Sequence, residues 1–345
     1  MKNLEALSLK VANNQLYILD QQLLPDEEKW LLVESVDHMV QIIKDLKVRG
    51  APLIGIAASL SLALFTNENT TWNEFKALEK KLRESRPTAV NLMNALDRML
   101  EIAERSSMDY QKIVEQAENL FAEDVELCLQ MAKAGADLIE DGDNILTHCN
   151  TGGLATVGLG TALGVIVQAH QQGKKIHVYV DETRPLLQGG RLTTWELEQH
   201  NIPYTLICDN MSGKLMAEGK VQKVFVGADR IAMNGDFANK IGTYNLAVIC
   251  SHHKVPFYTV APQTTVDTEC ASGAGIPVEM RKPEEVRGIY GSFGEIRWAP
   301  KNAKVFNPAF DVTPCGLLTG IVLDGKVLSQ GELKSGVLKR ILNKG

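Results

Sequence analysis

The chain has 345 residues, 45% of them hydrophobic and 23% charged, with a formal net charge of -6 at pH 7. This length exceeds what one small hydrophobic core organises, so two domains, or one large α/β domain with an appendage, are expected. The composition is typical of globular chains and excludes a disordered one. The lack of a basic face argues against a dedicated nucleic-acid binder or a polybasic membrane anchor.

The first third of the chain predicts a small β element followed by helices. Short alternating runs within residues 3–33, such as 15–19, predict a hairpin or small sheet. From Val36 the apolar residues follow the helical period, which predicts a helix ending near Lys47 with Ser35 as its N-cap.

Three further helices are predicted. The uncharged segment 51–65 is too short for a membrane span, which needs roughly 18 residues, and predicts a buried helix with Pro52 in its first turn. Residues 89–105 and 110–139 predict two more helices. No apolar leader is visible at the N-terminus and the six cysteines form no C-x-x-C pair, so we expect a cytoplasmic chain with free thiols.

The pattern changes near residue 144, where short β-rich runs begin to alternate with segments that can be helical. This alternation predicts a doubly wound parallel sheet. The boundary is expected between residues 125 and 143, giving a mostly helical domain at 1–130 and a sheet domain at 131–345. The predicted strands are 144–149, 175–181, 204–209, 223–229 and 256–262.

Four of these strands end in reactive or charged residues. Ligands of such sheets bind outside the carboxyl ends of the strands, so the site is predicted there. The residues concerned are Cys149, Asp181 with Glu182, Asp209 and Asp229.

Cys149 and Asp229 are the candidates for chemistry. Cys149 is followed by glycines and a small-residue segment predicted to start a helix, whose N-terminus would stabilise a thiolate; the alternative is a buried structural cysteine. Asp229 follows an apolar strand, where desolvation fits a carboxyl for proton transfer. An ion pair with Arg230 or a helix cap is the alternative for Asp229.

Polar and basic residues elsewhere suit an anionic substrate. Asn239 and Lys240 precede a predicted helix, and Arg49 and Arg86 each stand just before one, where N–H donors and a guanidinium favour phosphate. Gln188 adds a neutral donor and acceptor on the loop after the second strand. Solvated lysine and surface arginines are the competing interpretations.

Cofactor signals are weak. Glycines follow Cys149, but their spacing fits no dinucleotide-binding fingerprint. A divalent ion could in principle be bound by a convergence of Asp181, Glu182, Asp209, His148 and Asp229, yet no ligand spacing supports a metal site. We therefore expect neither a cofactor nor a metal.

Six segments together resemble the methylthioribose-1-phosphate isomerase family of methionine salvage, whose fold is shared with regulatory subunits of the eukaryotic initiation-factor exchange complex. The resemblance covers nearly the whole chain, in order. The segments are RGAPLIGIAA (49–58), RPTAVNL (86–92), ILTHCNTGGLATVGLGTALGVI (145–166), DETRPLLQGGRLTTWEL (181–197), VGADRIAMNGDFANKIGTYNLA (226–247) and FNPAFDVTP (306–314).

The resemblance implies a mostly helical N-terminal domain, a C-terminal Rossmann-like domain with a parallel sheet, and a homodimer. It implies isomerisation of 5-methylthioribose 1-phosphate to 5-methylthioribulose 1-phosphate. From the charge alone we expect no nucleic-acid or membrane partner. By motif, Cys149 carries over as the catalytic thiol and Asp229 as the acid. The substrate-binding positions carried over are Arg49, Gly50, Ala51, Arg86, Gln188, Asn239 and Lys240.

Alternatives remain open within this reading. Hydrogen can move from C2 to C1 as a proton through Cys149 or as a hydride. The substrate can also be 5-deoxyribose 1-phosphate or, with further cationic ligands, ribose 1,5-bisphosphate. A non-catalytic scaffold subunit is the alternative from another class.

Overall fold

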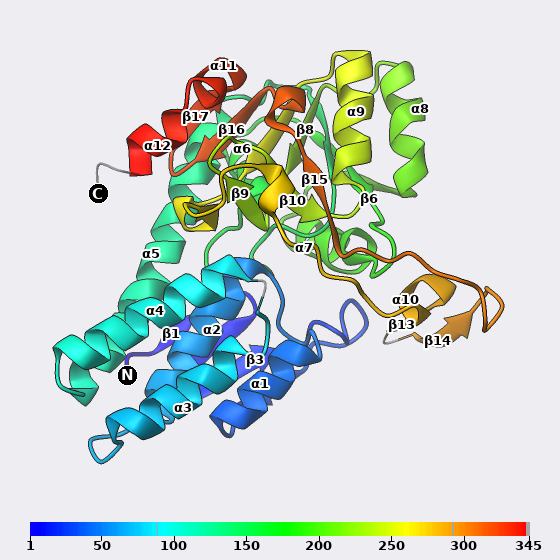
Figure 1. Cartoon of the computed structure of the whole chain (residues 1–345). Coiled ribbons are helices and arrows are strands. Elements are labelled where there is room, and N and C mark those ends of the chain that lie inside the picture. The colour runs from blue at the N-terminus through cyan, green and yellow to red at the C-terminus, as the bar shows by residue number, and fades with distance from the viewer. Residues whose placement is uncertain (88, 292, 343–345) are drawn as a thin grey trace. The chain divides into compact units, whose positions relative to one another are not determined.

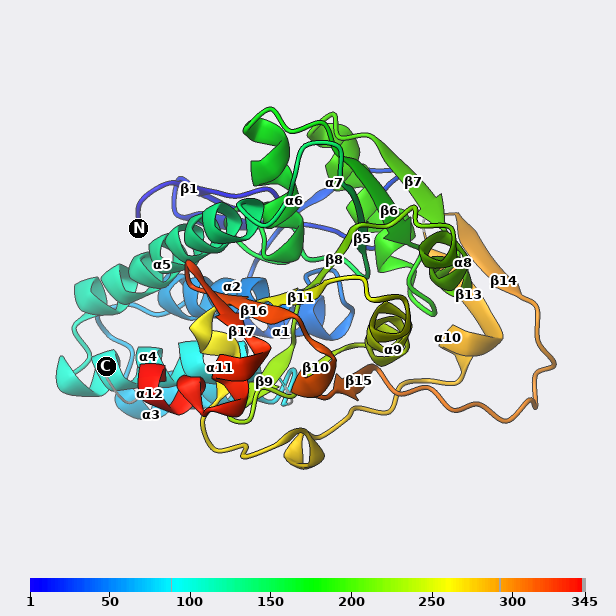
Figure 2. The same cartoon turned by 90° about the horizontal axis from the view of Figure 1, so that it is seen from above.

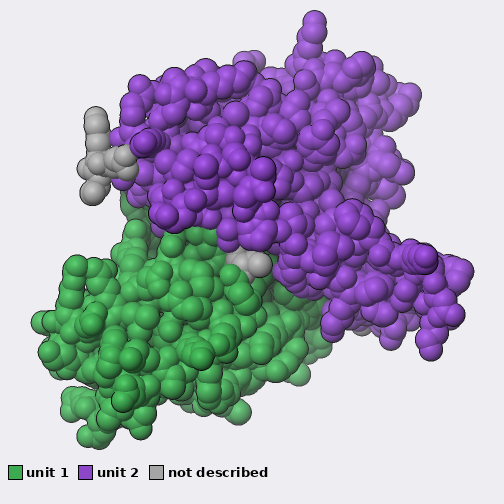
Figure 3. Space-filling model, in the orientation of Figure 1, with its two compact units in different colours: residues 1–127, 153–158 green, residues 128–152, 159–345 purple. Residues whose placement is uncertain are grey.

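The computed structural model describes residues 1–87, 89–291 and 293–342, which form two compact units. Unit 1 contains residues 1–127 and 153–158, and unit 2 contains residues 128–152 and 159–345; Figure 3 colours them separately. Among the residues described, no helix is long and apolar enough to cross a membrane.

Unit 1 begins with a small antiparallel sheet, which confirms the predicted β element. Its strands lie in chain order, and Leu9 pairs with Ile18 and Val11 with Leu16, all four buried against the helices of this unit. The strands are β1 (Leu4–Glu5), β2 (Leu9–Ala12), β3 (Gln15–Leu19) and β4 (Trp30–Leu32).

The helices of unit 1 follow the predicted pattern. Ser35 accepts a hydrogen bond from the N–H of His38, which confirms it as an N-cap, and Pro52 occupies the first turn of a helix buried along nearly its whole length. One helix was not predicted, although Thr71 and Glu74 form a capping box at its start. The helices are α1 (Val36–Lys44), α2 (Ala51–Leu64), α3 (Trp72–Arg83), α4 (Val90–Arg105) and α5 (Tyr110–Ala136) (Figure 1). The part of α5 from Cys128 on belongs to unit 2.

The segment that follows the candidate thiol is anchored in unit 1. Val157 donates its N–H to Asp124 Oδ2 at 2.8 Å, and Ala155 accepts the N–H of Leu53 at 3.2 Å. Gly50 lies so close that a Cβ there would come within 2.4 Å of the Ala155 Cα, and its φ is +91°. Any other residue at position 50 would therefore clash and be strained.

Asp124 is expected to make the free energy of unfolding decrease as the pH rises. Burial raises its pKa to about 6 from 3.8, so the folded state holds the proton more tightly and the stabilisation is lost as pH rises between these values. Asp124→Asn carries no charge and keeps an acceptor for Val157. Relative to this variant, we expect the wild type to lose about 1 kcal/mol of unfolding free energy between pH 5 and 7.5. Urea titrations at both pH values measure the difference, and a constant difference would refute the assignment.

Unit 2 is built on a seven-stranded sheet, in which six neighbouring strands are parallel and the edge strand β17 is antiparallel. The five predicted strands are confirmed and β16 and β17 were not predicted. The order is β17 (Lys326–Ser329), β16 (Gly320–Leu323), β11 (Phe257–Val260), β8 (Lys223–Val226), β5 (Asn144–Thr147), β6 (His177–Asp181) and β7 (Tyr204–Ile207).

Helices connect the strands, and Figure 2 shows α6 on one side of the sheet and α8 with α9 on the other. The helix predicted to begin after Gly153 begins only at Ala162, so its predicted start was wrong. Glycine disfavours a helix in this segment. Gly152 instead forms an isolated antiparallel β-bridge with Gly160, whose φ is +101°. The helices are α6 (Ala162–Gln171), α7 (Thr194–Gln199), α8 (Ser212–Ala217) and α9 (Thr243–His253).

Smaller elements complete unit 2. A second sheet has the order β12-β9-β10-β15 and carries Asn239 and Lys240 on β10. Its strands are β9 (Arg230–Ala232), β10 (Phe237–Lys240), β12 (Val266–Asp267) and β15 (Phe310–Thr313). The remaining elements are α10 (Glu284–Arg287), the hairpin β13 (Gly288–Gly291) and β14 (Gly294–Arg297), α11 (Gln330–Lys334) and α12 (Val337–Leu342).

Candidate active site

The residues predicted for chemistry follow neighbouring parallel strands. Cys149 comes just after β5 and Asp229 just after β8, and these strands pair with Thr147 opposite Phe225. The two segments that follow these strands also lie close together: a Cβ on Gly227 would be 2.7 Å from the Thr151 methyl group. The carboxyl edge of the sheet therefore brings the ends of β5 and β8 together.

Cys149 is buried and has a strained backbone. The residue is only 6% exposed. Its φ of +66° lies in the left-handed region that non-glycine residues rarely adopt. Two threonines hold this conformation: Thr183 Oγ1 accepts the Cys149 N–H at 2.8 Å, and Thr193 Oγ1 donates to its carbonyl at 2.7 Å. A cysteine that only filled a core would need no such conformation.

The loop after Cys149 rests on a buried glutamate. Asn150 Nδ2 donates to Glu196 Oε1 at 2.6 Å, and Gly152 lies against the same carboxylate, since a Cβ there would be 2.2 Å from Oε2. Glu196 is 1% exposed. Sequence reasoning did not single out Thr183, Thr193 or Glu196; their only signal was their place in the loop and helix after β6.

Asp229 is partly exposed and lies beside β10. Its N–H donates to the Ala238 carbonyl at 2.9 Å, and the next residues form β9 rather than a helix. The helix-cap alternative is therefore wrong. Arg230 Nη1 forms an ion pair with Asp267 at 3.1 Å.

Asn239 and Lys240 are held firmly at the end of β10. Asn239 Nδ2 donates to Thr243 Oγ1 at 3.0 Å, and that hydroxyl donates to the Lys240 carbonyl at 2.7 Å. Lys240 Nζ donates to the Ala309 carbonyl at 2.9 Å and lies 4.8 Å from the Phe310 ring centroid. Lys240 is 9% exposed, so it is no solvated surface lysine.

Gln188 is buried with an unsatisfied oxygen. Its Oε1 has no hydrogen-bond partner within residues 1–87, 89–291 and 293–342, although such an atom is costly to leave unpaired. It directly precedes a π-helical turn, Gly189–Thr193, which ends with the threonine that holds Cys149. Gly189 permits a close approach, since a Cβ there would overlap the Asp181 carbonyl.

The remaining candidates belong to unit 1. Arg49 is partly exposed and Gly50 is the N-cap of α2, whose Leu53 N–H is already bound by Ala155. Arg86 is partly exposed and precedes α4, which begins at Val90, and Thr88 lies outside the described residues. The phosphate-binding roles of Arg49, Gly50, Ala51 and Arg86 stay predictions.

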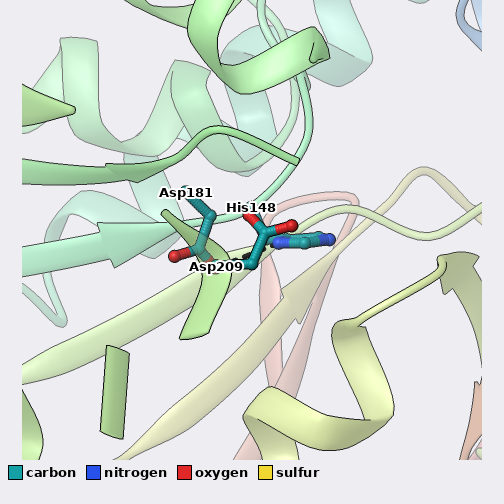
Figure 4. Close-up of side chains that lie close together, drawn as sticks. All are labelled: His148, Asp181 and Asp209. Carbon is teal, nitrogen blue, oxygen red and sulfur yellow. Dashed lines mark hydrogen bonds and ion pairs between the residues drawn. The ribbon is translucent and has the colours of Figure 1, made fainter. Parts of the chain in front are cut away.

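A buried histidine and two aspartates gather at the ends of β5, β6 and β7 (Figure 4). His148 Nδ1 lies 3.0 Å from Asp181 Oδ2 and its Nε2 lies 2.9 Å from the Ile241 carbonyl oxygen. Both carboxylate oxygens of Asp209 accept backbone N–H groups, those of Thr183 and Arg184. Protein contacts therefore engage both ring nitrogens of His148, one carboxylate oxygen of Asp181 and both of Asp209. Asp181 Oδ1 is buried and has no hydrogen-bond partner among the described residues.

The chain belongs to the initiation factor 2 subunit family, whose model matches residues 47–328. Curated relatives named methylthioribose-1-phosphate isomerase include one from Klebsiella pneumoniae subsp. pneumoniae, 55% identical over 97% of this chain and 98% of the relative. Another, from Serratia proteamaculans, is 54% identical over 99% of this chain and 100% of the relative.

Two solved structures have folds similar to this chain over nearly its whole length. The 5-methylthioribose 1-phosphate isomerase of Pyrococcus horikoshii is 43% identical, with a TM-score of 0.89 over 98% of this chain and 96% of that one. A structure titled translation initiation factor eIF-2B, subunit delta, from A. fulgidus is 40% identical, with a TM-score of 0.83 over 97% of this chain and 100% of that one.

Proposed function

We propose that the chain is an aldose-ketose isomerase of methionine salvage that converts 5-methylthioribose 1-phosphate to 5-methylthioribulose 1-phosphate. The observation that carries this proposal is the strained, doubly anchored Cys149 at a strand end next to that of Asp229, in a chain 53–55% identical to relatives of that name. Backbone strain of this kind concentrates at functional sites.

The substrate dictates the first step. A furanose with phosphate on C1 cannot open to a free aldehyde, so the bond between C1 and the ring oxygen must break while the phosphate stays attached. Asp229, in its protonated form, donates its proton to the ring oxygen as that bond breaks. The product of this step carries positive charge at C1, stabilised by the C1 oxygen.

Hydrogen then moves from C2 to C1. In one route the Cys149 thiolate removes the C2 proton, giving a phosphoenol intermediate, and returns it to C1 while the C2 hydroxyl loses its proton to the Asp229 carboxylate left by the first step. In the other, hydride shifts directly from C2 to C1 and the C2 hydroxyl loses its proton. Both routes end at the 2-ketone, and the buried surroundings of Cys149 suit both because they exclude water.

Substrate contacts are assigned to the groups that suit hydroxyl and phosphate oxygens. Gln188, with its unpaired Oε1, accepts from a sugar hydroxyl, and Asn239 and Lys240 donate to substrate oxygens beside Asp229. Arg49, the backbone of Gly50 and Ala51, and Arg86 are proposed to bind the phosphate.

The finer features are proposed on the same basis. Residues 131–345 form a Rossmann-like catalytic domain, supported by the parallel strand order β8-β5-β6-β7, and residues 1–130 form the helical domain. We further propose a cytoplasmic homodimer that needs no cofactor or metal.

Steady-state assays on 5-methylthioribose 1-phosphate and 5-deoxyribose 1-phosphate in parallel test the proposal. We expect kcat/KM at least about tenfold higher for the methylthio sugar, equivalent to about 1.4 kcal/mol of transition-state binding in an apolar pocket. Near-equal values would instead indicate a general 5-deoxypentose salvage enzyme. No turnover of either sugar would contradict the proposal and favour a scaffold role, which the likeness to an initiation-factor subunit suggests.

A further inference from the structure

His148, the residue before Cys149, joins two segments of the site. It is 1% exposed, and its ring lies between Asp181 at the end of β6 and the carbonyl of Ile241, which follows Lys240. A carbonyl oxygen can only accept, so Nε2 carries a proton in this contact. One imidazole therefore connects the Cys149 strand end with the turn between β10 and α9.

The turn is shaped around this ring. Gly242 has a φ of +106°, and a Cβ there would lie 2.9 Å from His148 Cε1. On its other side the turn is held by Asp311, whose carboxylate accepts the N–H of Gly242 at 2.7 Å and of Tyr244 at 3.0 Å. His148 supplies the donor that satisfies the Ile241 carbonyl, and Asp311 supplies acceptors for the following N–H groups.

The charges that face His148 keep the ring oriented. Burial lowers the pKa of His148, but the hydrogen bond and charge of Asp181 and the charge of Asp209 raise it above its ordinary value. Asp311 also interacts with the ring: burial raises the pKa of Asp311, and the charges of His148 and Lys240 act to lower it. Burial raises the pKa of Asp181 to about 6, while the hydrogen bond and the charge of His148 act to lower it.

We propose that His148 is a positioning residue that fixes the Cys149 strand end relative to the turn bearing Lys240. This inference rests on the proposed function, which makes Cys149 and Lys240 the groups that act on the substrate. His148 itself does not act on the sugar: it works through its neighbours on the chain. Displacing catalytic groups by about 1 Å typically costs about a hundredfold in rate.

Two variants of similar size distinguish the hydrogen bonds of the His148 ring from its volume. The amide nitrogen of glutamine can occupy the place of Nε2, so His148→Gln keeps a donor for the Ile241 carbonyl. The amide of asparagine lies at the place of Nδ1, so His148→Asn contacts Asp181 and loses Ile241. His177→Gln, on the partly exposed histidine at the start of β6, is the matched control.

We expect His148→Gln to keep kcat/KM within about fivefold of wild type and His148→Asn to lose about fiftyfold or more, mostly in kcat. His177→Gln should match wild type. Equal losses in both His148 variants, or no loss in either, would overturn the inference. If His148→Asn does not fold, Asp181→Asn and Asp181→Val form the second pair, with activity retained only in the variant that can still hydrogen-bond Nδ1.

Alkylation of Cys149 by iodoacetamide, followed on its own peptide by mass spectrometry, gives a readout that needs no turnover. We expect the thiol of His148→Asn to react at least about fivefold faster than that of His148→Gln, because the released strand end opens more often. Equal alkylation rates would count against the proposal that the His148–Ile241 hydrogen bond holds the Cys149 strand end in place. If wild type failed to turn over the sugar while this difference held, the proposed function would fail and the positioning role of His148 would stand.

Discussion

Replacement of Cys149 by serine is expected to lower kcat by about 10³-fold, with KM changed by less than about threefold. Serine keeps the size and the two backbone hydrogen bonds, from Thr193 and to Thr183, so the left-handed conformation should persist. A hydroxyl, however, gives up its proton far less readily than a thiol, so at neutral pH almost no serine is present as the anion that could remove the C2 proton. Cys208→Ser, at an exposed cysteine, is the control and should match wild type.

The hydrogen-transfer route can be read from the same pair of proteins. With Cys149 as the base, wild type working in deuterium oxide should incorporate solvent deuterium at C1 of the product. No incorporation during complete turnover would count strongly against the proton route. A direct hydride shift would also make the Cys149→Ser loss smaller, since the thiol would then shape the site without moving a proton.

The larger elements could be predicted because their signals are local. The helical period from Val36 and the uninterrupted apolar run after Pro52 depend only on neighbouring residues, and both helices are confirmed. The strands β9, β10 and β15 were not predicted, since each has three or four residues and is defined by partners far along the chain. The glycine-rich segment after Cys149 was mistaken for the start of a helix for a similar reason, because its contacts lie with α2 and Asp124 in unit 1.

The site likewise contains features that the sequence predicts locally and features that arise only from contacts between distant segments. Cys149 and Asp229 could be placed at one edge of the sheet because the carboxyl ends of parallel strands share it, whereas the pairing of β5 with β8 was not predicted. The positive φ of Cys149 and the two threonines that hold it could not be predicted, because each arises from a contact between distant loops. His148 was weighed only as a candidate metal ligand, whereas its nitrogens are bound to Asp181 and Ile241.

Asp229→Asn is expected to lower kcat by about 10²–10⁴-fold while leaving KM within a few fold. The amide has the size and polarity of the carboxyl, and the N–H bond from position 229 to the Ala238 carbonyl is unaffected, so the substrate should still bind. An amide cannot supply a proton to the ring oxygen as the bond to C1 breaks. The loss should therefore be confined to chemistry, and single-turnover rates should fall as much as kcat.

The pH profile of kcat provides a second test of Asp229. A carboxyl that must be protonated gives a rate that declines as pH rises through its pKa in the complex, and this limb should be absent from the residual activity of Asp229→Asn. Asp143→Asn is the matched control, because Asp143 forms an ion pair with Lys223, 2.6 Å away, at the opposite end of β8 from Asp229. A variant Asp229→Asn that kept the wild-type profile would exclude Asp229 as the acid and require another donor at this edge of the sheet.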